Sequence, residues 1–209
     1  MTPLLQPCRR PGHLLLSIGL LNASCLASPD PATEFQLYTK PLVISERGTV
    51  TSYVLQTSKG RFSFLPPPDW AVQENPKTKE VLMMARSLIT SIRFKVVEDA
   101  QETTKEARLA QWHQAVLENH PDAKITAEFP CYSSKLEGVA LDLERLAPNR
   151  TKVFTRLAFL PLPAGRIEFD LTTTAGNFAE TRLAFGNFLT SFRVEPPAGS
   201  LPSPRPAAK

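Results

Sequence analysis

Two pairs of carboxylates stand at a spacing that could support chemistry: Asp142 with Glu144, and Glu168 with Asp170. Residues two apart on a β-strand point to the same side of a sheet, so each pair is expected to line one surface. Two carboxylates on one surface could act as the acid and base of a glycosidase-like site. We favour the solvated side of a sheet with cross-strand ion pairs, a more common arrangement. The candidate binding face predicted from this pattern consists of Asp142, Glu144, Arg156, Glu168 and Asp170.

Cysteine and histidine offer two further chemistries, and neither comes with a specific motif. Cys131 and His113 could form a nucleophile and its base, but neither residue lies in a recognisable catalytic signature. His113 and His120 fall seven residues apart on a predicted helix, about 10 Å along its axis, which is too far for one zinc ion. No glycine-rich phosphate loop and no G-x-S-x-G motif occurs. We therefore expect no cofactor and no metal, and keep a hydrolase that uses the acidic face or Cys131 as an alternative function.

The first 27 residues have the pattern of an export signal. Arg9 and Arg10 form a positive region, and the apolar stretch that follows is too short to span a bilayer. Small residues before Ser28 predict cleavage there, and lipoprotein processing at Cys25, which would add a lipid anchor, is the alternative. We therefore expect a periplasmic or secreted protein with no transmembrane segment after cleavage. One cysteine then remains, so an internal disulfide is excluded.

The charge of the chain argues against a nucleic-acid partner. The net charge is +4, with 24 basic and 20 acidic residues. Two of the basic residues, Arg9 and Arg10, belong to the predicted signal, so the remaining chain is close to neutral. A nucleic-acid-binding protein would carry a dense basic face. We expect the partner to be a protein of the cell envelope.

Strand patterns begin after residues 28–48, which are polar and are interpreted as an N-terminal arm. Residues 49–56 and 61–65 predict a hairpin with Gly60 in its turn. Three prolines, Pro66, Pro67 and Pro68, cannot donate to a strand ladder, so the second strand must end there. Trp70 behind them is expected to cover one end of the core, and a solvent-facing binding role is the alternative. Residues 81–86 and 91–97 follow as extended segments, the second with Arg93 and Lys95 on its polar side.

The second half of the chain predicts two helices around an antiparallel meander. Thr103 and Glu106 form a capping box, and the helix they begin presents a buried stripe of Leu109, Trp112, His113 and Val116. Strands are expected at 125–129, 138–146, 152–163 and 165–174. A helix capped by Asn177 then buries Phe178, Phe185, Phe188 and Phe192. Residues 196–209 are rich in proline and are predicted to be disordered.

Two stretches of the sequence resemble the PsbP-like superfamily, which includes the Ran-binding Mog proteins and DcrB-like exported bacterial proteins. "GRFSFLPPPDW" is similar to the opening of these domains, and "GRIEFDLTTTAGNFAETRLAFGNFLTSFRV" is similar to their ending. The link between Trp70 and Val81 departs from the family pattern. The resemblance implies an α+β fold: a single-domain α/β/α sandwich over residues 49–195, with a mostly antiparallel sheet of six or seven strands and helices on both faces.

The resemblance also bears on function, because members of the superfamily are mostly non-enzymatic and act by binding proteins or supporting assembly. Photosynthetic members bind calcium or manganese, but no residue of this chain matches those ligands position by position. We therefore expect an exported, non-catalytic binding or accessory protein of the cell envelope. A small-ligand carrier is a further alternative, which predicts an apolar cavity behind Trp112 and Phe185.

Overall fold

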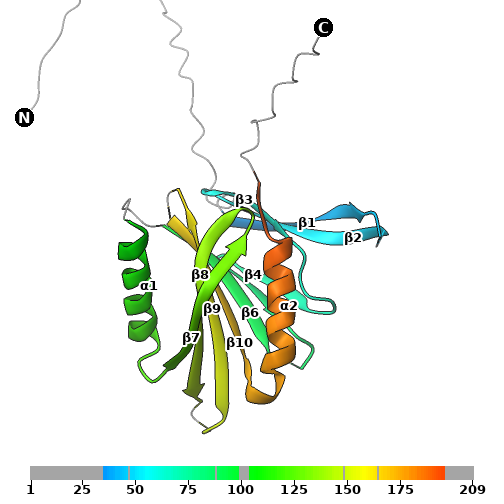
Figure 1. The fold of residues 1–209 in the computed structure, drawn as a ribbon. Coiled ribbons are helices and arrows are strands. Elements are labelled where there is room, and N and C mark those ends of the chain that lie inside the picture. The colour runs from blue at the N-terminus through cyan, green and yellow to red at the C-terminus, as the bar shows by residue number, and fades with distance from the viewer. Residues whose placement is uncertain are drawn as a thin grey trace, which may run out of the picture.

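The computed structural model describes residues 35–46, 48–87, 89–98, 104–147, 149–163 and 165–195. The predicted signal (1–27) and the proline-rich tail (196–209) lie outside these residues. The described chain forms two antiparallel sheets and two α-helices (Figure 1). The larger sheet has the order β4 (Ala71–Asn75), β5 (Glu80–Met84), β6 (Ser91–Val97), β10 (Gly165–Thr174), β9 (Lys152–Leu162), β8 (Leu136–Leu146) and β7 (Lys124–Ser133). The smaller has the order β1 (Phe35–Ile44), β2 (Gly48–Thr57), β3 (Gly60–Phe64) and β11 (Arg193–Glu195).

The layers of the fold follow from the faces of the seven-stranded sheet. Helix α1 (Lys105–Asn119) packs on one face, where Trp112 and Val116 contact strands β8 and β9. Helix α2 (Phe178–Ser191) and the four-stranded sheet share the other face (Figure 1). The predicted α/β/α sandwich with an antiparallel sheet of six or seven strands is therefore confirmed, and the larger sheet has seven strands. The sequence did not anticipate the second sheet, to which the 49–65 hairpin contributes β2 and β3.

The β2–β3 hairpin forms as its sequence predicts. Gly60 begins β3 with a φ of 141°, which an L side chain rarely adopts. β3 ends at Phe64, and the three prolines begin two residues later, after Leu65. The backbone N–H of Trp70 then donates to the carbonyl of Pro67 at 3.2 Å. Trp70 is partly buried and packs against the main core, as expected. The prolines therefore turn the chain out of the smaller sheet and toward the larger one.

Two further strands lie in segments that have no clear strand pattern. β1 pairs with β2 along its whole length, from Phe35 opposite Thr57 to Ile44 opposite Gly48. Residues 35–44 of the predicted arm are thus a strand of the smaller sheet. β4 occupies the link between Trp70 and Val81 and pairs with β5. The seven strands of the larger sheet include this unpredicted edge strand.

Helix α1 begins one residue later than its capping box indicates. Thr104 is the N-cap, and its hydroxyl accepts a hydrogen bond from the backbone N–H of Ala107 at 3.2 Å. The predicted cap Thr103 lies outside the described residues. Trp112 stacks on Phe159 of β9 with ring centroids 5.3 Å apart, and both are almost fully buried. This contact holds the helix on the sheet.

Helix α2 follows a short 3₁₀ turn, η2 (Ala175–Asn177), and supplies the centre of the main core. Asn177 is the N-cap residue, but its side chain makes no capping hydrogen bond, in contrast to the prediction. The buried aromatic cluster that α2 completes consists of Phe62, Phe64, Phe94, Phe169, Phe185, Phe188 and Phe192. Phe178 is only partly buried and instead stacks on Phe154 with ring centroids 5.0 Å apart. Neither helix of the described chain is long and apolar enough to cross a bilayer.

Candidate functional site

The five residues of the predicted binding face lie on opposite sides of the seven-stranded sheet. Asp142, Glu144 and Arg156 alternate with residues that pack under α1, so they project toward the face that α2 covers. Glu168 and Asp170 alternate with Ile167, Phe169 and Leu171 of the main core, so they project toward α1. The structure therefore divides the predicted face into two separate groups.

The first group is a structural ion pair beneath α2. Arg156 donates to both carboxylate oxygens of Asp142, at 2.7 and 2.8 Å, and the two side chains are only 14% and 11% exposed. The guanidinium also lies over the ring of Phe129 at 4.5 Å and over that of Phe178 at 5.6 Å. Glu144 pairs with Lys152 at the end of the same strands. These groups are engaged by one another and by aromatic rings, so this side of the sheet presents little free charge.

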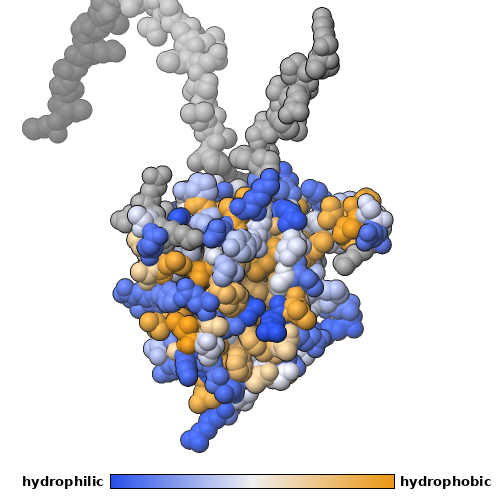
Figure 2. All heavy atoms as spheres, in the orientation of Figure 1, coloured by the Kyte–Doolittle hydropathy of each residue, from blue (hydrophilic) through white to orange (hydrophobic). Residues whose placement is uncertain are grey.

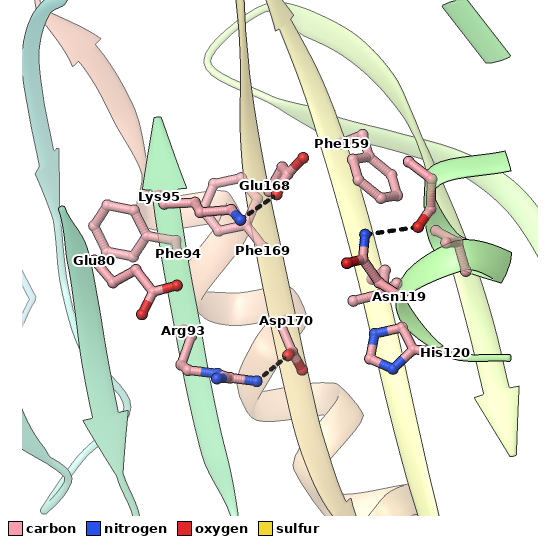
Figure 3. Close-up of a pocket in the computed structure, with 13 residues that line it drawn as sticks. Glu80, Arg93, Phe94, Lys95, Asn119, His120, Phe159, Glu168, Phe169 and Asp170 are labelled. Carbon is pink, nitrogen blue, oxygen red and sulfur yellow. Dashed lines mark hydrogen bonds and ion pairs between the residues drawn. The ribbon is translucent and has the colours of Figure 1, made fainter. Parts of the chain in front are cut away.

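The second group lines a groove of about 290 Å³ between α1 and the sheet, here called the charged groove. Arg93 of β6 pairs with Asp170 of β10 at 2.6 Å. One step along the same two strands, Lys95 pairs with Glu168 at 3.1 Å (Figure 3). Both pairs join residues that are directly opposite in the antiparallel register. The groove thus carries a ladder of alternating charges on a rigid surface.

The end of α1 and strand β5 complete the charged groove. Asn119 and His120 approach from the helix, and Glu80 approaches from β5 (Figure 3). Burial lowers the pKa of His120, opposed by the charge of Asp170 and reinforced by the charges of Arg145 and Arg93. The ring is therefore neutral near pH 7 and offers one donor and one acceptor. Sequence reasoning missed the convergence of Glu80, Asn119 and His120 here, because three distant segments bring them together.

The thiol and imidazole considered as a catalytic pair do not meet. Cys131 of β7 packs in the main core on the α2 side, whereas His113 lies on α1, across the sheet. His113 binds Glu128 at 2.9 Å instead. Burial raises the pKa of Cys131 to about 11, with Arg156 opposing the shift, so the thiol is protonated at neutral pH. A nucleophile activated by an adjacent base is therefore not formed by these residues.

The described residues also lack a cluster suited to a metal ion. Within them, no three His, Cys, Asp or Glu side chains converge on a common point. In the charged groove, the carboxylate of Asp170 is already paired with the guanidinium of Arg93.

Two other hollows border the aromatic residues behind which an apolar cavity was predicted. A groove of about 400 Å³, here called the Trp112 groove, lies between the first half of α1 and strands β7, β8 and β9. A smaller hollow of about 260 Å³ lies between α2 and β7 and includes Phe185 in its wall. Figure 2 shows hydrophobic side chains between the positions of α1 and β8 in this view.

The chain was compared with protein-family models, with curated protein sequences and with solved structures. No protein-family model and no curated protein sequence matches the chain. Cyanobacterial PsbP (CyanoP) from Synechocystis sp. PCC 6803 superposes with a TM-score of 0.52 at 14% identity, covering 87% of this chain and 99% of CyanoP. The chain has a PsbP-like fold.

Two further solved structures are similar to this PsbP-like chain at lower scores. The Ran-binding protein Mog1p of Saccharomyces cerevisiae gives a TM-score of 0.47 at 11% identity, covering 76% of this chain and 96% of Mog1p. LpqN of Mycobacterium tuberculosis, involved in cell envelope biogenesis, gives 0.44 at 10% identity, covering 77% and 92%. At these identities the similarity concerns the fold, and function has to be inferred from the sites.

Proposed function

We propose that this chain is an exported, non-catalytic binding protein that recognises a protein partner of the cell envelope through the charged groove. The observation that carries the proposal is the ladder formed by Arg93–Asp170 and Lys95–Glu168 beside a neutral His120. These charges are held in fixed positions by two adjacent strands. A rigid pattern of both signs discriminates between partners by electrostatic complementarity.

The shape of the charged groove also favours recognition of a protein segment. Val116 of α1 and Phe159 of β9 contribute apolar area to its wall, next to the charges. Protein interfaces combine an apolar centre with a polar rim in this way. A partner loop that inserts an apolar side chain and offers its own charges to the ladder fits these walls.

The exported location rests on the amino-acid sequence. Residues 1–27 carry the pattern of a signal peptide, which predicts a periplasmic or secreted protein. Mass spectrometry of the protein purified from its native cells tests this point. We expect a mature chain that begins at Ser28, or at a lipidated Cys25 if the lipoprotein alternative holds. A chain that still begins at Met1 would rule out export by this route.

Site-specific crosslinking tests the partner surface. A photocrosslinking amino acid replaces Asn119, an exposed residue of the charged groove, and in a control replaces Leu183, which is 66% exposed on α2. We expect a discrete protein adduct in the envelope from position 119 that is absent from position 183. Reversing one charge of the ladder, Lys95→Glu, should abolish the adduct. Adducts that are equal at both positions, or that persist unchanged in the Lys95→Glu variant, would overturn the proposal.

The hydrolase alternative is tested separately. Wild type is assayed against a broad panel of ester, peptide and glycoside substrates, together with Asp142→Ala, Glu168→Ala and Cys131→Ala. We expect no turnover by any of the four proteins. Turnover by wild type that one of these substitutions removes, in a variant that still folds, would establish an enzyme.

A further inference from the structure

The Trp112 groove has walls that are mainly apolar and belong to rigid elements. Leu109 and Trp112 come from α1, Val139 from β8, and Pro130 and Pro161 from β7 and β9. Its volume of about 400 Å³ falls within the range of pockets that hold small organic ligands. Stacking of Trp112 on Phe159 fixes the position of the indole. The groove therefore does not depend on a mobile element for its shape.

The polar groups of this groove that lack partners are hydrogen-bond donors. Trp112 is only 4% exposed, and its Nε1–H is buried without an acceptor in the described structure. Arg108 also lines the groove, and no acceptor among the described residues contacts its guanidinium group. Indole and guanidinium groups donate and never accept. A buried donor without an acceptor is costly, so an occupant that supplies an acceptor is favoured.

The carboxylates near the rim do not satisfy these donors, because they have other partners. Glu128 accepts from His113 at 2.9 Å, and Glu137 is also engaged by another group. Of the three charged side chains that line the groove, Arg108 is therefore the one without a partner among the described residues. A matching ligand must combine an apolar body with a negatively charged acceptor.

We propose that the Trp112 groove binds a small amphiphilic carboxylate, with its hydrocarbon body against Leu109, Trp112 and Val139 and its carboxylate toward Arg108. The indole N–H of Trp112 donates to an oxygen of the same ligand. This site is separate from the charged groove, which lies toward β6 and β10, and the inference does not rest on the proposed function. It gives the small-ligand carrier alternative a location and a ligand class.

Nuclear magnetic resonance of the indole N–H groups provides a direct test, because the chain contains only two tryptophans. The probe is decanoate, added below its micellar concentration to the uniformly ¹⁵N-labelled protein. We expect the Trp112 indole signal to move downfield in a saturable manner, as a hydrogen bond forms, while the Trp70 signal stays in place. Decyltrimethylammonium has the same chain length and the opposite charge, and should bind at least tenfold more weakly.

Three variants separate the contributions to binding, measured by calorimetry. Arg108→Gln should weaken decanoate binding about fivefold, the effect of an ion pair at a partly exposed rim. Trp112→Phe keeps a ring against Phe159 but removes the donor, and should weaken binding about tenfold. Arg182→Gln is the matched control, since Arg182 is exposed on α2, and should leave affinity unchanged.

Each contrary result would refute the inference. No decanoate binding, equal binding of decyltrimethylammonium, or binding that leaves the Trp112 signal in place would exclude this ligand class from the groove. Equal losses in Arg108→Gln and Arg182→Gln would indicate nonspecific attraction to positive charge. Circular dichroism confirms that each variant keeps its fold before its affinity is compared.

Discussion

Replacement of Phe192 by alanine should remove a large share of the stability of this domain. Phe192 is fully buried where the chain passes from α2 to β11, and it contacts rings from both sheets and from α2. Its ring centroid lies 5.1 to 6.3 Å from those of Phe62, Phe64, Phe94, Phe169 and Phe188. A buried Phe→Ala change costs about 3 to 5 kcal/mol, and five ring contacts place this site near the upper end.

Urea denaturation followed by circular dichroism measures this loss. With a slope of about 2 kcal/mol per molar urea, a cost near 5 kcal/mol lowers the midpoint by about 2.5 M. Leu183→Ala on the exposed side of α2 is the control, and should change stability by less than about 0.5 kcal/mol. A midpoint shift below about 0.5 M for Phe192→Ala would mean that the phenylalanine cluster does not join the two sheets as described.

Three further predictions concern substitutions at five sites. Burial raises the pKa of the Cys131 thiol from 9.0 to about 11, which favours the protonated form in the folded state. Its contribution is complete below pH 9 and is lost as pH rises through 11, so wild type should lose about 3 kcal/mol more than Cys131→Ala over that interval in pH-dependent urea titrations. Asp142→Ala leaves Arg156, whose side chain is only 14% exposed, without its partner and should cost about 3 kcal/mol or more. Asp170→Ala should cost about 1 kcal/mol or less, because its partner is 48% exposed; equal losses in the two variants would contradict this reasoning. A Cβ at Gly138 would lie 1.8 Å from a backbone oxygen of β9, so Gly138→Ala should lose at least about 2 kcal/mol. Gly186→Ala, with open space around it in α2, should gain about 0.5 to 1 kcal/mol, and melting curves of the two variants that agree would contradict the packing described.

The strands of the larger sheet were predictable wherever one side of a segment is apolar. In β6, Ile92 and Phe94 are buried while Arg93 is exposed, which matches the alternation in the sequence. β1 gave no such signal, because Phe35 is its only buried residue and most of the strand is exposed at a sheet edge. Local sequence therefore could not indicate the second sheet, whose existence depends on pairing with β2.

The candidate site could be predicted only in part, because alternation does not say which side of the sheet a residue faces. Asp142 and Glu168 both alternate with apolar residues, yet they point to opposite faces. Both faces of this sheet are covered, so each bears apolar residues and the contrast between them is weak. The position of His120 beside Asp170 follows from how α1 crosses the sheet, a relation between segments far apart in the chain.

The pairing of β11 with β3 makes completion of the smaller sheet depend on the last strand of the described chain. Val194 stands opposite Phe62, so the smaller sheet gains its last strand only after almost all of the described chain has been synthesised. Until then β3 keeps an open edge, and Phe192 cannot take its place among the other rings. The smaller sheet of this fold is therefore completed by the last strand of the described chain, far in sequence from the β2–β3 hairpin that it joins.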